Sequence, residues 1–189
     1  MKEHRHFILH KPYGYLSQFI TNQTKRKKKM LGELYDFPEG TMAIGRLDFA
    51  SEGLLLLTTD GKVSQEIRSS KYEKEYYVQV DGLITQEAIE QLKKGVEIGF
   101  EGKKYITKPG KASIINNPEF PLRSQKIRDD RHGPTSWISV IIREGKFRQV
   151  RKMTAAVGYP TLRLLRIRIG TITIDDLKNG EVQEVNQLL

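Results

Sequence analysis

Apolar and polar residues form short bursts along this chain, and most of these bursts predict strands. Residues 7–10 are apolar and end at a Pro/Gly turn, which predicts a first strand. Leu54 to Thr59 begins with four consecutive leucines and predicts a second strand, closed by a turn at Asp60-Gly61. Residues 74–82 alternate between apolar and polar positions, so Tyr76 is expected to share one face with the valines that follow it.

Helical spacing occurs in two places. Thr85 is typical of an N-cap, and the apolar residues behind it recur at helical spacing until Gly95 ends the helix. Residues 147–157 predict a second helix, ended by the glycine that follows it. Its apolar stripe is Val150, Met153 and Val157, and its basic face is Arg148, Arg151 and Lys152.

The remaining elements complete a prediction of the fold class. Further strands are expected at residues 96–98, 137–143, 162–169 and 171–174. Residues 116–134 contain prolines and many charges and predict a long surface loop. This loop is not expected to be a domain boundary, because strands resume directly after it. The succession of strand, helix and short strand over residues 74–98 suggests an α+β protein. The length fits one large domain or two small ones, and we expect a single domain over residues 1–189 because the loop at 116–134 does not mark a domain boundary.

Charge changes the functional picture. Lys and Arg number 32 against 23 Asp and Glu, so the net charge is +9, which is typical of proteins with a polyanionic partner. Between Arg143 and Arg168 stand eight basic residues and one acid, Glu144. The run from Lys25 to Lys29 indicates a solvated loop, with loose phosphate contact as the alternative.

Several kinds of site are disfavoured by composition. Cysteine is absent, which excludes disulfides and thiolate chemistry and agrees with a reducing cytoplasm. The four histidines do not form ligand pairs, so no metal site is expected. Glycine-rich nucleotide loops and a nucleophilic serine elbow are missing, and no apolar run approaches the ~18 residues of a membrane span.

A charged pair stands at the entrance of the leucine-rich strand. Arg46 and Asp48 lie between Gly45 and Gly53, just before the leucines. One interpretation is that Asp48 caps a turn or joins a structural ion pair. The other is that a carboxylate is held at the rim of a dry pocket, kept ionised by an arginine that lowers its pKa by ~1–3 units.

Carboxylate, aromatic residues and arginines together suit an enzyme that acts on a base within structured RNA. Such an enzyme extrudes the nucleotide at a cost of a few kcal/mol. It needs aromatic rings on which bases stack, each worth ~1–3 kcal/mol, and cations along the phosphates.

Four motifs in order resemble one known family. Residues 45–55 (GRLDFASEGLL) resemble the catalytic motif of the pseudouridine synthases related to the small-subunit ribosomal RNA enzyme A. Residues 74–78 (KEYYV) are similar to the family's tyrosine motif, and residues 144–153 (EGKFRQVRKM) to its arginine motif. Residues 10–14 (HKPYG) resemble its opening motif, in which His10 replaces the usual Asn. Residues 134–137 and 147–166 are most similar to family members that modify large-subunit ribosomal RNA.

The resemblance implies roles for individual residues. Asp48 would be the catalytic carboxylate, attacking or deprotonating at the ribose, and Arg151 would pair with it. Tyr76 would stack on the extruded uracil, and the alternative is that it is a tyrosine of the core. The alternative for Arg151 is a structural salt bridge. Arg46 would fill the gap left by the base or grip its phosphate. RNA contacts are also expected at Lys11, Lys74, Arg148 and Lys152.

The resemblance also implies the overall activity. We expect isomerisation of uridine to pseudouridine in large-subunit ribosomal RNA, without cofactor, metal or nucleotide, by a cytoplasmic monomer with no membrane contact. The implied fold is a long, mainly antiparallel sheet flanked by helices, with a central active-site cleft. Since the first motif begins at residue 10, we expect no small basic RNA-binding domain ahead of it. The alternative is a non-catalytic RNA-binding or ribosome-assembly protein.

Overall fold

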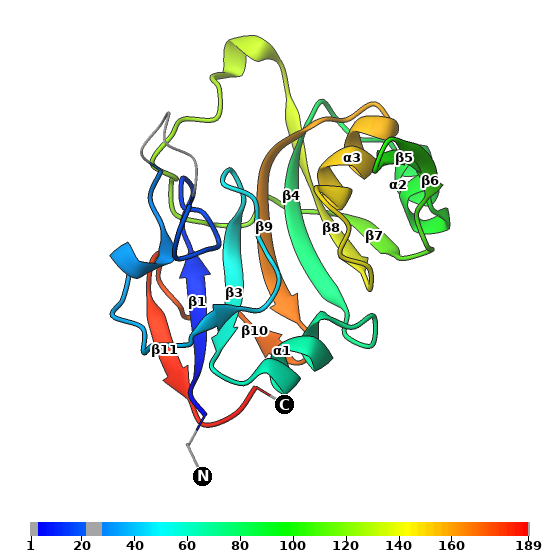
Figure 1. Cartoon of the computed structure of the whole chain (residues 1–189). Coiled ribbons are helices and arrows are strands. Elements are labelled where there is room, and N and C mark those ends of the chain that lie inside the picture. The colour runs from blue at the N-terminus through cyan, green and yellow to red at the C-terminus, as the bar shows by residue number, and fades with distance from the viewer. Residues whose placement is uncertain (1–3, 22–27, 189) are drawn as a thin grey trace. The chain divides into compact units, whose positions relative to one another are not determined.

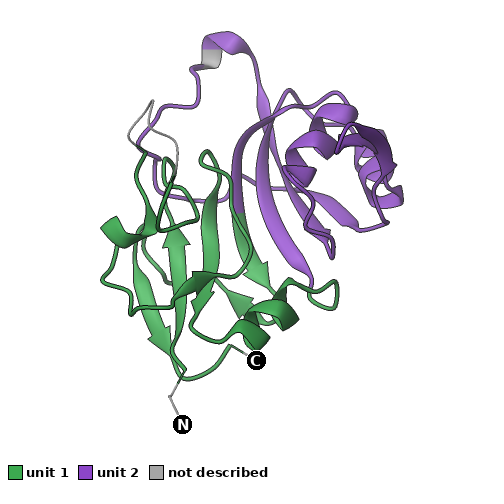
Figure 2. Ribbon diagram, in the orientation of Figure 1, with its two compact units in different colours: residues 1–72, 166–189 green, residues 73–165 purple. Residues whose placement is uncertain are grey.

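The computed structural model describes residues 4–21 and 28–188, which fall into two compact units (Figures 1 and 2). Unit 1 consists of Met1–Tyr72 and Arg166–Leu189, and unit 2 is the intervening segment Glu73–Leu165. Residues 25–27 of the basic run lie outside the described residues.

The strands of unit 1 are arranged around β3 (Glu52–Thr58), which carries the four leucines. β1 (His6–Lys11) pairs antiparallel with β3, and its other edge pairs antiparallel with β11 (Val182–Val185). β2 (Met42–Ala43) also pairs with β3. All four leucines are fully buried, so both faces of β3 are covered. This explains a continuous apolar run where a half-exposed strand would alternate.

The core of unit 1 combines residues from both ends of the chain, namely Ile44, Leu54, Leu56, Ile67, Ile169, Ile174 and Leu188. α1 (Gly61–Arg68) supplies Ile67 to it. The turn predicted at Asp60-Gly61 is instead the start of this helix, because the Asp60 carboxylate accepts hydrogen bonds from the N–H groups of Lys62 at 2.8 Å and Val63 at 3.4 Å. A short 3₁₀ helix, η1, spans Leu31–Glu33.

Residue 166 divides β9 (Thr161–Ile169) between the two units. β10 (Ile172–Thr173) pairs antiparallel with its end, within unit 1. The strands predicted at residues 162–169 and 171–174 are therefore confirmed.

In unit 2, β8 (Thr135–Ile142) lies between β4 (Lys74–Asp81) and β7 (Lys111–Ile115), and both pairings are antiparallel. Buried and half-buried residues alternate along β4, as predicted. α2 (Gln86–Lys94) packs against β7. The Thr85 hydroxyl caps α2 by accepting from the Ala88 N–H at 3.3 Å, and Gly95 ends it with a φ of +101°, so both predicted boundaries are confirmed.

A small hairpin completes unit 2. It joins β5 (Glu97–Phe100) to β6 (Lys103–Ile106) through a turn in which both Glu101 and Gly102 have positive φ, as the type I′ turn of a two-residue hairpin requires. α3 (Gln149–Ala156) packs against β5. The predicted long loop at residues 116–134 connects β7 to β8 and contains a 3₁₀ turn, η2 (Asp130–His132).

Three helices and these antiparallel strands confirm the predicted α+β class. The single-domain organisation and the central cleft stay predictions. None of the helices in the described residues has the length and the apolar composition of a membrane-spanning helix.

Candidate active site

Asp48 lies in unit 1, in the loop that joins β2 to β3. The buried Ser17 holds the residue before it, since the Ser17 hydroxyl donates to the Leu47 carbonyl at 2.8 Å and accepts from the Leu47 N–H at 3.0 Å. On the other side, the Asp48 carbonyl accepts from the Ser51 N–H at 2.9 Å. The backbone of the half-buried Asp48 is therefore fixed on both sides.

The opening motif at residues 10–14 supports this loop. The Gly14 N–H donates to the Phe49 carbonyl at 2.9 Å, and the rings of Tyr13 and Phe49 pack with centroids 6.0 Å apart. Gly14 has a φ of +84°, which a residue with a side chain rarely adopts. Two motifs that are distant in the sequence thus form one supported loop pair within unit 1.

Lys11 is fully buried in this motif. Its ammonium group donates to the carbonyls of Pro12 at 2.9 Å and Tyr15 at 2.7 Å. Burial lowers the pKa of Lys11 to about 7, an effect that the charges of Glu52 and Asp48 oppose and that of Arg166 reinforces. RNA contact by Lys11 stays a prediction, and its contacts within the protein favour a supporting role.

Two further buried charged residues, Glu52 at the start of β3 and Arg166 on β9, were missed from the sequence. Glu52 is 1% exposed, and Arg166 is 5% exposed and donates through Nε to the Leu54 carbonyl at 2.8 Å. Gly53, which follows Glu52, has a φ of +104°, and a Cβ there would lie 2.3 Å from the Arg166 carbonyl oxygen. In the sequence, the glycine after Glu52 was the signal that another part of the backbone approaches closely at this position. Arg163 is also buried, so not all of the basic segment 143–168 is exposed.

Arg46 lies two residues before Asp48 in the same loop and is exposed to solvent. Its position suits either of the roles that the resemblance implies. Neither role is tested by the structure.

Tyr76 lies on β4 in unit 2, opposite Val140 of β8. It is 8% exposed and shares its face with Val78 and Val80, as predicted. Lys74 is on the same face, also buried, and its ammonium group donates to the Arg143 carbonyl at 3.1 Å. RNA contact by Lys74 therefore stays a prediction, and this bond gives the side chain a structural contact.

Arg151 is half-buried on α3, which confirms the predicted helix with somewhat shorter bounds. Val150 and Met153 are buried, so the predicted apolar stripe is correct at these positions. Arg148 is exposed and stands at the N-cap with a left-handed conformation, φ +52° and ψ +31°, instead of in the first turn. Lys152 is half-buried and donates to the Gly99 carbonyl at 2.6 Å.

Glu144 anchors the turn that leads into α3. It accepts hydrogen bonds from the Tyr105 hydroxyl, the Lys108 N–H at 2.9 Å and the Gln149 side chain at 2.8 Å. Burial raises the pKa of Glu144, but the hydrogen bonds from these donors lower it by a larger amount. The pKa of Glu144 therefore lies below the usual range. Sequence reasoning noted Glu144 as the single acid of a basic segment and as the first residue of the arginine motif, and assigned it no role.

The structure therefore brings together Lys11, Asp48, Glu52 and Arg166 within unit 1. Tyr76 and Arg151 belong to unit 2, and their convergence with Asp48 stays a prediction. Among the described residues, no group of three or more His, Cys, Asp or Glu side chains is placed to hold a metal ion.

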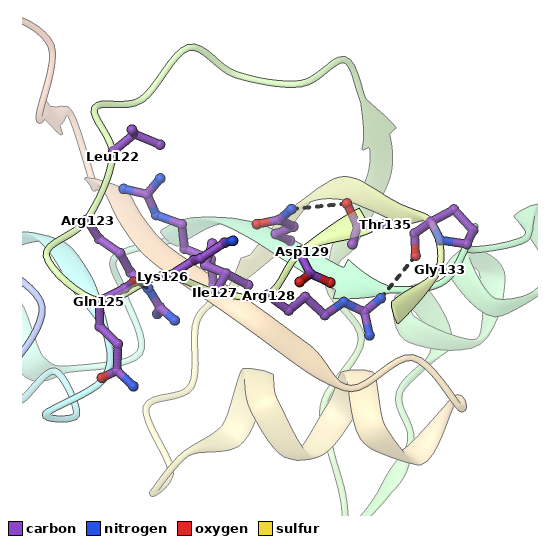
Figure 3. A pocket seen from close by; sticks show the side chains of 12 residues that line it. Leu122, Arg123, Gln125, Lys126, Ile127, Arg128, Asp129, Gly133 and Thr135 are labelled. Carbon is purple, nitrogen blue, oxygen red and sulfur yellow. Dashed lines mark hydrogen bonds between the residues drawn. The ribbon is translucent and has the colours of Figure 1, made fainter. Parts of the chain in front are cut away.

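Unit 2 also contains a basic cavity of about 620 Å³ beneath the long loop (Figure 3). Its cationic side chains are Arg123, Lys126, Arg128 and Arg163, while Asp129 is its acid. Gln79 of β4 lines the cavity, and side chains alternate along a strand. The cavity therefore lies on the face of β4 opposite to Tyr76 and is separate from the predicted tyrosine site.

Comparisons with known proteins agree with this arrangement of motifs. A family model described as RNA pseudouridylate synthase matches residues 5–156. The ribosomal large subunit pseudouridine synthase E of Vibrio vulnificus (strain CMCP6) is 39% identical over 98% of this chain and 77% of its own length. The ribosomal small subunit pseudouridine synthase A of Escherichia coli (strain K12) is 33% identical over 97% of this chain and 71% of its own.

A solved structure is also similar to this chain. The crystal structure of a pseudouridylate synthase matches 98% of this chain and 71% of its own with a TM-score of 0.77 and 28% identity. The family match extends from β1 to the end of α3 and so includes Asp48, Tyr76 and Arg151. On these grounds, the chain belongs to the family of RNA pseudouridylate synthases.

Proposed function

We propose that this protein converts specific uridines of large-subunit ribosomal RNA to pseudouridine. The observation that carries the proposal is the Asp48 loop, which Ser17 and Gly14 hold in place at the entrance of β3. Two relatives named ribosomal large subunit pseudouridine synthase E, 39% and 41% identical over nearly the whole chain, support the choice of RNA.

The reaction is an isomerisation, so its atoms balance without a co-substrate. The bond from N1 of uracil to C1′ of the ribose breaks, and a bond from C5 to C1′ forms. A proton leaves C5 and N1 gains one. Asp48 is the carboxylate that acts at the ribose, and Arg151 keeps it ionised and oriented in a partly dry site. Tyr76 stacks on the extruded uracil.

Binding depends on cations that reach solvent. Arg46 and Arg148 are exposed, and we assign them to RNA contact together with the half-buried Lys152. The buried Lys11 and Lys74 we assign to support of the motifs that contain them. We infer that the protein is a monomer. We also infer that it acts in the cytoplasm, where bacteria such as those that contain the relatives assemble their ribosomes.

Mapping pseudouridines in ribosomal RNA tests the proposal. Cells with and without this protein are compared, and the deletion strain is complemented with the wild type or with Asp48→Asn. One or more large-subunit sites should disappear in the deletion strain, return with the wild type and stay absent with Asp48→Asn. Identical maps in all strains would favour the non-catalytic RNA-binding alternative.

A further inference from the structure

Phe147 is an exposed aromatic residue at the entrance of α3. Its side chain is 68% exposed. Among the described residues, the exposed large apolar side chains include one other aromatic residue, Tyr35, which packs against the rings of Phe7 and Phe37. Single exposed apolar residues are common and by themselves mean little. The surroundings of Phe147 distinguish it from the rest.

Phe147 has one cationic side chain near its ring and another next to it in the sequence. The exposed Arg148 follows it directly, and the Lys152 ammonium group lies 5.6 Å from the ring centroid. Lys152 also donates to the Gly99 carbonyl at 2.6 Å, so its position beside the ring is fixed by the hairpin. An exposed ring with cationic side chains nearby is the combination that binds single-stranded nucleic acid, since bases stack on the ring and cations contact the phosphates.

The turn that carries Phe147 is rigid before any ligand arrives. The Lys146 N–H donates to the Gln149 side chain at 3.1 Å, and the Gln149 N–H donates to the Lys146 carbonyl at 3.1 Å. The Lys146 ammonium group lies 4.3 Å and 4.1 Å from the ring centroids of Phe100 and Tyr105. Preorganisation of this kind lowers the entropy lost on binding.

Backbone strain occurs at the same place. Arg148 has a φ of +52°, and apart from Glu101 it is the non-glycine residue with positive φ in the described chain. Such strain persists where the surroundings enforce it and is frequent at functional sites. In this turn it accompanies two consecutive side chains that both reach solvent.

We propose that Phe147 is a stacking platform for an unpaired base of the substrate RNA, with Arg148 and Lys152 contacting the adjoining phosphates. The base is a neighbour of the target, because the target uracil is assigned to Tyr76. This inference rests on the proposed function for the identity of the RNA, but stacking itself tolerates any base. Phe147 is thus a determinant of substrate preference for single-stranded or loop nucleotides over duplex.

Binding of two labelled RNA probes tests the platform. The probes are a single-stranded oligoadenylate and a duplex of equal charge, and fluorescence anisotropy reports the Kd of each. Phe147→Ala should weaken oligoadenylate binding about 5- to 150-fold and leave duplex binding unchanged. Phe147→Leu should bind almost as weakly, whereas Phe147→Trp should bind like the wild type. The salt dependence should be the same in all variants because no charge is removed.

Ile106 offers a matched control, since it is an apolar residue of unit 2 that is also 68% exposed. Ile106→Ala should bind both probes like the wild type. The indole of Phe147→Trp should be quenched by oligoadenylate, against a constant background from Trp137, which is 7% exposed. An unchanged Kd for Phe147→Ala, an equal loss on duplex, or full recovery in Phe147→Leu would overturn the platform.

The outcome is separable from that of the proposed function. If the wild type forms no pseudouridine on ribosomal RNA but Phe147→Ala loses oligoadenylate binding, the platform stands and the proposed substrate is wrong. If the wild type is active and Phe147→Ala keeps the wild-type Kd, the platform is wrong and the function stands.

Discussion

At the scale of single residues, the proposed mechanism assigns the chemical step to the side chain of Asp48. In Asp48→Asn the amide has nearly the same shape as the carboxylate but carries no charge, so the variant should fold and bind RNA. Single-turnover formation of pseudouridine should fall to background, because the loss is in the chemical step. The exposed Asp36 provides a control, and Asp36→Asn should react like the wild type. Product from a clean Asp48→Asn preparation would remove Asp48 from the catalytic role.

Lys11 makes stability depend on pH near neutrality. Its pKa is about 7 in the folded chain and ~10.4 in an unfolded one, so the unfolded chain binds more protons between these values. The free energy of unfolding therefore rises with pH across this window, by at most about 1.4 kcal/mol per pH unit from this group. Below pH 7 both states are protonated and the contribution is constant.

Urea unfolding at pH 7, 8 and 9 tests this dependence against Lys11→Met, which cannot titrate at that position. The wild type should gain stability relative to the variant as the pH rises. Glu52, Asp48 and Arg166 are the charged groups that interact with Lys11, and all three are present in both proteins. Parallel pH profiles of the two proteins would mean that Lys11 has an ordinary pKa.

At the scale of elements, the loop that carries Asp48 depends on one hydroxyl. Ser17→Ala leaves the buried N–H and carbonyl of Leu47 without their partner, which should cost about 1–3 kcal/mol. Because Asp48 follows Leu47, we expect a lower single-turnover rate at saturating RNA with little change in Kd. Thr41→Val is the control, since the Thr41 hydroxyl also donates to a loop carbonyl, that of Pro38. Equal rates for Ser17→Ala and the wild type would show that the loop holds Asp48 without Ser17.

The start of β3 tolerates glycine alone. A Cβ at position 53 would lie 2.3 Å from the Arg166 carbonyl oxygen, and φ is already +104°. Gly53→Ala should therefore destabilise the protein by more than about 3 kcal/mol in urea unfolding. Gly32→Ala should change stability far less, because no atom lies within 4 Å of a Cβ there. Similar losses for both variants would contradict this account.

Elements with a strong local signal could be predicted, and weaker ones could not. α2 was predicted because Thr85 and Gly95 mark its ends. α1 was missed because it is short and begins with glycine, so that Asp60-Gly61 resembles a hairpin turn in the sequence. The helix is stabilised by the burial of Ile67 in the core, which the local sequence does not indicate. β11 was also missed, since its exposed and half-buried residues show no apolar face.

The residues proposed for the site come from the motifs. Asp48, Tyr76 and Arg151 followed from the resemblance, and charge counting alone would not have selected them. The burial of Lys11 and Arg166 could not be predicted, because a lysine in a turn and an arginine in a basic segment both suggest exposed positions. Their burial depends on packing around β3, which no local pattern records.

At the scale of the whole molecule, the net charge of +9 predicts binding that weakens with salt. Arg148→Ala should flatten the slope of log K against log salt by roughly one unit or less. Lys152→Ala should do the same and also lower Tm, because it removes the bond to the Gly99 carbonyl. Lys94, exposed on α2, provides the control. Unchanged slopes for both variants would place the RNA on another surface.

Unit 1 is assembled from two segments separated by the whole of unit 2. Its core needs Ile169, Ile174 and Leu188 to cover Leu54 and Leu56 of β3, and β1 needs β11 along its edge. During synthesis, the continuous segment of unit 2 emerges complete while unit 1 still lacks its last strands. Asp48 and its supporting loop leave the ribosome early, yet their unit closes only once residues 166–189 have been made. A nascent chain stalled before residue 166 should therefore expose Leu54 and Leu56 and depend on chaperones.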